Sequence, residues 1–175
     1  MSLYLIEGVV KQLQSEQIEK VLDVIASAAF ELNSELIEAQ VTENLERLFL
    51  VIDAPEAEIA EKSFAAGGLT TTLVKQVRLI GQDLATVKNR KGKANYLVEW
   101  NLPGGLTMEA YLQRKAEKSP LYAQVPEIKF ERTYVCEDMS KCLCFYDSPN
   151  ESTVKEARQI VSAPIDTLTS IRNLH

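Results

Sequence analysis

The chain has 175 residues, enough for one domain or two small ones, and 46% of them are hydrophobic, enough to bury a core. Its net charge of −6 argues against nonspecific nucleic-acid binding, because a phosphate backbone needs clustered lysines and arginines. No apolar run approaches the roughly 20 residues that span a bilayer, and the first residues lack the basic region of a secretory signal, so we expect no membrane contact.

The apolar pattern of the first half predicts the order strand, helix, strand, strand, helix, strand. Ser15 is a suitable N-cap, and Ile18, Leu22 and Ile25 follow it at helical spacing. Pro55 favours the start of the second helix, because the N–H that proline lacks would have no partner in a first helical turn. We expect these elements at residues 3–9, 15–33, 36–42, 47–52, 55–66 and 72–79.

The second half predicts the same order. Pro120 stops its first helix early, because proline removes a backbone donor and clashes with the preceding turn. Residues 81–93, between the halves, are polar and lack a strong pattern, so we interpret them as a solvated linker. The expected elements of the second half cover residues 95–101, 108–118, 129–136, 141–146, 150–160 and 167–173.

Two short motifs recur in the same order in both halves. Residues 4–7, Tyr-Leu-Ile-Glu, return as Tyr-Leu-Val-Glu at 96–99, and residues 48–55 have a counterpart at 142–149 that also ends in Asp-x-Pro. This self-similarity indicates an internal duplication. We therefore expect a first repeat at residues 1–80, a linker at 81–93 and a second repeat at 94–175.

The predicted order of elements is that of the ferredoxin-like βαββαβ unit, which packs two helices on one face of an antiparallel sheet. A unit of roughly 80 residues buries only a modest fraction of its surface, and its second sheet face is bare. Each repeat can cover the bare face of the other. We expect an α+β protein in which two ferredoxin-like repeats pack sheet to sheet as a pseudo-dimer, like a dimeric α/β barrel, with a cleft between the sheets.

Several segments resemble a known family. They are residues 96–99, 105–107, 134–135, 145–149 and 163–166, with weaker matches at 4–7 and 52–55. These segments are similar to the small domain of unknown function 4242, a family that includes nickel-responsive proteins with a dimeric ferredoxin-like fold. The resemblance implies that this chain fuses into one polypeptide what its relatives build as a homodimer. It also implies that nickel binding depends on histidine and acidic side chains, and the only histidine here is His175, so we expect no metal site.

Side-chain alternation along the strands predicts which residues face the other sheet. Ile37, Ala39 and Val41 form the apolar side of their strand and should face the helices, which turns the polar side toward the cleft. The same reasoning applied to the other strands gives the candidate ligand-binding residues, which are Glu7, Glu38, Gln40, Glu99, Arg132 and Tyr134. Position 38 corresponds to position 132 in the repeat, so an acid stands opposite an arginine and an ion pair becomes possible.

Two interpretations of these residues stay open. Glu7 and Glu99 are a carboxylate pair able to do general acid/base chemistry if burial raises one pKa, or they form hydrogen bonds that hold the sheets together. Arg132 and Tyr134 bind an anion, or they form a structural salt bridge with Glu38 or Glu99.

The remaining reactive side chains indicate no catalytic centre. Cys136, Cys142 and Cys144 are odd in number and crowded, which is typical of a reducing compartment such as the cytoplasm. We expect them in the core, because a zinc site would need four such ligands. No catalytic residue and no cofactor is expected.

Three functions are compatible with these patterns. The first is a ligand-binding or sensing module with a small molecule as partner, held in the cleft between the sheets. The second is a small cofactor-free enzyme, of the isomerase or oxygenase type, in the same cleft. The third is a structural or interaction protein with a filled interface. An open polar cleft favours the first two, and in each case we expect a monomer or a weak homodimer.

Overall fold

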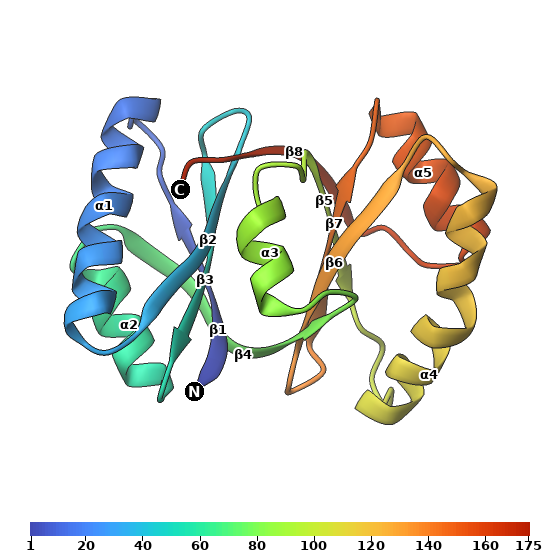
Figure 1. Cartoon of the computed structure of the whole chain (residues 1–175), viewed down its shortest axis with the longest axis horizontal. Coiled ribbons are helices and arrows are strands. Elements are labelled where there is room, and N and C mark those ends of the chain that lie inside the picture. The colour runs from blue at the N-terminus through green and yellow to red at the C-terminus, as the bar shows by residue number, and fades with distance from the viewer.

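Eight antiparallel strands close into one barrel in the computed structural model, which describes all 175 residues. The strands follow one another around the barrel in the order β1-β3-β2-β8-β5-β7-β6-β4. Helices α1 and α2 lie outside the strands of the first half, and α4 and α5 lie outside those of the second half (Figure 1). The predicted α+β class and barrel architecture are therefore confirmed.

The strands and helices have these bounds: β1 Ser2–Val9, α1 Ser15–Glu31, β2 Glu35–Thr42, β3 Arg47–Ala54, α2 Ala57–Ala65, β4 Thr70–Ile80, α3 Leu84–Arg90, β5 Tyr96–Asn101, α4 Met108–Lys118, η1 Ser119–Gln124 (a 3₁₀-helix), β6 Lys129–Cys136, β7 Lys141–Asp147, α5 Glu151–Ile160 and β8 Thr167–Asn173. Apart from α3 and η1, each was expected from the sequence, with ends that differ by a few residues. Pro120 lies in η1 and marks the change from α4 to the tighter helix, as its missing N–H requires.

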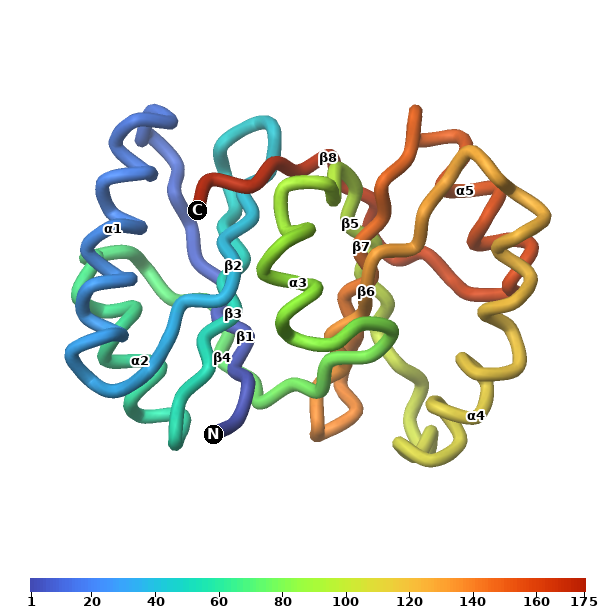
Figure 2. Tube along the Cα trace, in the orientation of Figure 1, coloured from blue at the N-terminus to red at the C-terminus, as the bar shows by residue number.

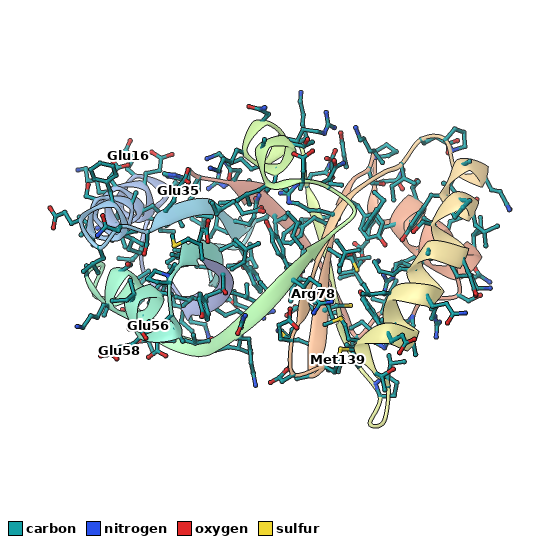
Figure 3. All side chains as sticks on the ribbon, turned by 60° about the horizontal axis from the view of Figure 1, so that its bottom comes forward. Glu16, Glu35, Glu56, Glu58, Arg78 and Met139 are labelled. Carbon is teal, nitrogen blue, oxygen red and sulfur yellow. The ribbon has the colours of Figure 1, made fainter.

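Two seams join the halves into a ring. At one seam β2 pairs with β8 over three residue pairs, from Gln40–Asn173 to Thr42–Ile171, and at the other β4 pairs with β6 over four. The end of the chain returns to the first half to make the first seam (Figure 2). At the second seam Arg78 of β4, labelled in Figure 3, forms an ion pair with Glu137 at 3.0 Å.

Three apolar clusters fill the molecule. One lies between the first-half strands and α1 and α2, because the apolar stripe of α1 (Ile18, Leu22 and Ile25) turns inward. A second lies between the second-half strands and the helices α4 and α5. The third fills the barrel interior and includes Tyr134 and Phe145. The interior is thus packed with side chains, where the sequence predicted a cleft.

A β-bulge changes the expected side-chain pattern of β2. The pairing with β3 shifts between Leu36 and Glu38, so Ile37 joins the interior cluster, although we expected it to face the helices with Ala39 and Val41. The pairing of β6 with β7 shifts in the same way around Glu131. A bulge adds one residue to a strand without changing its apolar pattern. Alternation alone therefore assigns Ile37 to the wrong face of the strand.

Residues 81–93 are more than a solvated linker, because they contain the helix α3. Val87 of α3 is fully buried in the interior cluster. Two surface cations of α3 form ion pairs with opposite halves, Lys88 with Glu35 at 2.8 Å and Arg90 with Glu131 at 2.6 Å. The connection therefore packs between the halves as part of the fold (Figure 1).

None of the helices combines the length and apolar character that a crossing of the membrane would require.

Candidate functional site

Glu38 and Arg132 meet inside the barrel as a bidentate ion pair. Arg132 donates from Nε to Oε2 of Glu38 at 2.9 Å and from Nη2 to Oε1 at 2.6 Å. Tyr134 donates its hydroxyl to the same carboxylate, and so does Gln40, from Nε2 at 3.0 Å. Arg132 also lies over the ring of Phe145, 5.1 Å from its centroid. The predicted pairing of Glu38 with Arg132 is confirmed, and both side chains are almost fully buried.

This cluster is electrically balanced, and only Arg132 Nη1 and Gln40 Oε1 lack a hydrogen-bond partner in it. Burial would lower the pKa of Arg132, but the neighbouring Glu38 carboxylate raises it above its usual value. Burial and the same carboxylate raise the pKa of Tyr134 well above its usual value, so its hydroxyl stays protonated and keeps donating. Gln40 ties the cluster to the connection between the halves, because its Nε2 also donates to the Lys91 carbonyl at 2.8 Å.

Glu7 and Glu99 belong to a second, separate cluster, which they form with Arg47 and Lys141. Arg47 bonds Glu7 at 2.9 Å and Glu99 at 2.9 Å, and Lys141 lies 2.6 Å from Glu7 and 3.0 Å from Glu99. Burial would raise the pKa of Glu99, but its hydrogen bonds with Arg47 and the charge of Lys141 lower it below the usual value. The six predicted residues are therefore divided between two clusters, and Arg132 pairs with Glu38 rather than with Glu99.

A pocket with converging polar groups lies elsewhere, outside the barrel in the second half. It is bounded by α4, η1, α5 and the outer face of β5 and β7, and we call it the α4–α5 pocket. It encloses a cavity of about 30 Å³, room for about two water molecules. Its lining residues are Trp100, Tyr111, Arg114, Lys115, Lys118, Ser119, Tyr122, Cys144, Arg158, Val161 and Ala163.

Arg158 is the central group of the α4–α5 pocket. It is only 2% exposed, yet it forms no ion pair. Its Nη1 donates to the hydroxyl of Tyr146 at 3.2 Å, and its Nη2 donates to the carbonyl of Pro164. Its Nε makes no hydrogen bond. A buried guanidinium is therefore held by neutral groups, with one donor left over.

A second unused donor lies in the same pocket. The hydroxyl of Tyr111, a residue that is 1% exposed, makes no hydrogen bond. Burial raises the pKa of this phenol, so it stays protonated and remains a donor. Tyr122, by contrast, is satisfied, since its hydroxyl lies 2.6 Å from that of Tyr146.

Three further cations surround the cavity: Arg114, Lys115 and Lys118, all from α4. None of them forms an ion pair. Arg114 lies over the ring of Trp100 at 5.3 Å, and Lys115 lies over Phe130 at 4.7 Å, so aromatic faces hold both cations in place. A chain with a net charge of −6 thus gathers four unpaired cations around one cavity.

The sequence analysis missed this pocket, although one signal points to it. In α5 the buried residues Val154 and Ala157 share their face with Arg158, so an arginine occupies the apolar stripe of an amphipathic helix. A buried guanidinium at such a position needs a hydrogen-bonding or charged partner. The contributions of α4 and η1 come from residues distant in the sequence, and no local pattern brings them together.

The residues present do not fit a nickel centre. No three side chains of the His, Cys, Asp or Glu type converge anywhere in the structure. His175, the only histidine, is half-buried at the end of the chain. We therefore assign no metal ligands.

Comparison with known proteins agrees with the resemblance seen in the second half. A sequence model of the family described as nickel responsive protein SCO4226-like matches residues 96–171, less than half of the chain. No curated protein matches the sequence.

Solved structures share the fold at very low identity. A candidate monooxygenase from Lactobacillus acidophilus has a TM-score of 0.54 at 8% identity, covering 100% of this chain and 95% of its own. A candidate chlorite dismutase, TA0507, has a TM-score of 0.57 at 7% identity, covering 99% and 95%. An anthrone oxidase-like protein has a TM-score of 0.50 at 13% identity, covering 99% and 92%. At such identities the likeness concerns the architecture alone.

Proposed function

We propose that the chain is a small-ligand-binding protein, and that the ligand is an anion with a carboxylate head group held in the α4–α5 pocket. The carboxylate accepts from Arg158 Nε and from the Tyr111 hydroxyl, two buried donors of this pocket that have no partner. Arg114, Lys115 and Lys118 supply the surrounding positive charge. The cavity takes the head group, and the aromatic walls suit an apolar remainder.

The observation that carries this proposal is the burial of Arg158 without a carboxylate. A buried charge without a partner is costly, and a buried donor without an acceptor costs about 1–3 kcal/mol. Arg132 shows how the same protein treats a structural arginine, because there Glu38 supplies a bidentate partner. The contrast between the two buried arginines favours an external anion at Arg158.

The six residues predicted from the sequence have a different role in this proposal. Glu38 pairs with Arg132, and Glu7 and Glu99 pair with Arg47. The barrel interior is filled by side chains. Such contacts favour the interpretation that these groups hold the two sheets together. A ligand role in the interior stays a prediction.

An enzymatic function is the second candidate. The solved structures of similar fold carry the names monooxygenase, chlorite dismutase and anthrone oxidase-like protein, which supports the expectation that this architecture hosts small-molecule chemistry. A thiol that lines the α4–α5 pocket is the feature of this chain that favours such chemistry.

We also propose that the chain arose by tandem duplication of a ferredoxin-like unit. Three observations support this origin. The strands of each half lie in corresponding order, β4-β1-β3-β2 and β8-β5-β7-β6. The bulges at residues 37 and 131 occupy corresponding positions. Arg47 and Lys141 also correspond, at the same offset of 94 residues, and both bind the pair Glu7 and Glu99.

The binding proposal is tested with the protein's own fluorophore. Trp100 is the only tryptophan and lines the pocket, so an anion bound there changes its emission. Benzoate, acetate and inorganic phosphate are titrated into wild-type protein in a low-chloride buffer. We expect a saturable change with benzoate, and a dissociation constant at least about tenfold larger for Arg158→Met, the effect of losing one charged hydrogen bond.

Arg78→Met is the matched control, because it removes an arginine at the β4–β6 seam that does not line the pocket. It should bind as the wild type does. If Arg158→Met does not fold, Tyr111→Phe removes one donor with little change in shape and should weaken binding about fivefold. Equal affinities for wild type and either pocket variant, or no saturable change with any of the three anions, would refute the proposal. Saturation by phosphate alone would keep the anion site and exclude the carboxylate class.

A further inference from the structure

A thiol forms the floor of the α4–α5 pocket. Cys144 of β7 is 1% exposed and lines the cavity. The hydroxyl of Thr133, on the neighbouring strand β6, donates to its Sγ at 3.2 Å. An O–H aimed at sulfur stabilises a thiolate more than a thiol, because the hydrogen bond then has a charged acceptor.

The charged side chains that line the pocket with Cys144 are all positive. Arg158 and Lys115 line the same pocket, and neither has a carboxylate partner. The neighbouring Cys142 thiol and the charges of Lys115 and Arg158 lower the pKa of the Cys144 thiol, against burial, which raises it. The neighbouring Cys144 and burial raise the pKa of Cys142 instead.

We propose that Cys144 is a thiolate in the folded protein and that it is the site at which the chain reacts with hydrogen peroxide. The thiolate offsets part of the positive charge of Lys115 and Arg158, and Arg158 Nε stays without a hydrogen bond. Cys136 and Cys142 stay neutral thiols. A cavity of about 30 Å³ accepts a molecule of two heavy atoms and excludes bulky oxidants.

The reaction is a two-electron oxidation of the sulfur. Cys144 Sγ attacks one oxygen of the peroxide, an S–O bond forms, and the O–O bond breaks. The other oxygen leaves as hydroxide and takes a proton from solvent to become water. Arg158 Nε and the Tyr111 hydroxyl belong to the same pocket lining and offer unused hydrogen bonds to the charge that develops on the leaving oxygen. The product on the protein is a sulfenic acid at Cys144.

This reactivity shares the pocket with the proposed anion but does not depend on it. A single thiolate leaves three of the four cations uncompensated, so an anion can still bind. A bound carboxylate occupies the space that peroxide needs, and it should slow the oxidation. The two proposals can therefore fail separately.

The charge state is tested by ultraviolet thiolate absorbance at about pH 7, below the usual thiol pKa of about 8.5. Wild-type protein should show the absorbance of one thiolate, which is lost on unfolding at the same pH. Cys144→Ser should abolish this signal, and Cys136→Ser, which changes a thiol in the barrel interior, should keep it. Equal absorbance of wild type and Cys144→Ser would overturn the proposal.

The chemistry is tested by adding hydrogen peroxide with a sulfenic-acid trap and mapping the adduct by mass spectrometry. The adduct should lie on Cys144, and Thr133→Val should slow its formation about fivefold, the effect of one hydrogen bond. An adduct on Cys136 or Cys142 instead, or no adduct, would overturn the reaction. Adding benzoate separates the two proposals. Unchanged labelling at saturating benzoate counts against the anion site alone, and benzoate binding without a thiolate signal counts against this inference alone.

Discussion

Replacement of Arg132 with methionine should destabilise the protein strongly. The substitution keeps an unbranched side chain in the barrel but removes the cation that pairs with Glu38, a carboxylate that is 1% exposed. Two of the four hydrogen bonds that Glu38 accepts disappear, and those from Gln40 and Tyr134 remain. A buried carboxylate is then left without a compensating charge.

Breaking a buried ion pair by removing one partner costs about 3–5 kcal/mol. The loss of two charged hydrogen bonds, each worth about 1.5–3 kcal/mol, gives about 3–6 kcal/mol, which overlaps that range. Unfolding in urea measures the free energy of unfolding, from the midpoint and the slope of the transition. The double variant Glu38→Gln/Arg132→Met removes both charges and should recover about 2 kcal/mol relative to the sum of the single changes.

Lys88→Met is the matched control, because it breaks the exposed pair with Glu35 between α3 and β2. Surface ion pairs contribute less than about 1 kcal/mol, so this variant should unfold close to the wild type. A loss below about 1 kcal/mol for Arg132→Met, similar to the control, would refute the idea that the interior pair is desolvated and structural.

One further substitution and one titration test other parts of the structure. Val87→Ala shortens the buried residue of α3 and should lower the free energy of unfolding by about 1–2 kcal/mol in urea, whereas a truly solvated linker would show no change. Asp138 has its pKa lowered to about 2 by hydrogen bonds from Lys75 and Ser140. The pair should thus contribute stability above about pH 4, the unfolded pKa, and lose it as the pH falls through about 2. Because the carboxylate is largely exposed, the contribution should stay below about 1 kcal/mol, and an NMR titration of Asp138 that gives a pKa near 4 would contradict it.

The strands and long helices could be predicted because each carries its own pattern. A short run of apolar residues marks strands such as β5, and a stripe of apolar residues at helical spacing marks α1. The helix α3 is too short to show such a stripe, since only Leu84 and Val87 face the interior cluster and Val87 is its only buried residue. Its burial depends on the barrel that it covers, and no local pattern encodes that.

Of the two sites, the interior ion pair could be predicted from the sequence and the α4–α5 pocket could not. The pairing of Glu38 with Arg132 could be predicted because both lie on strands related by the repeat. The α4–α5 pocket depends on the distance between α4 and α5, which their sequences do not encode. What the sequence does contain is Arg158 on the apolar face of a helix, a conflict between local pattern and residue type. Such conflicts are expected at functional sites.

The closed ring of strands limits how one molecule can meet another of its kind. Every strand has two neighbours in the same polypeptide, and the parts of β2, β4, β6 and β8 that extend beyond the short seams have an edge without a strand partner. The ring therefore offers no full-length free edge for strand addition by a second molecule. Dilution cannot separate halves that belong to one chain, and the thermal midpoint should be independent of protein concentration.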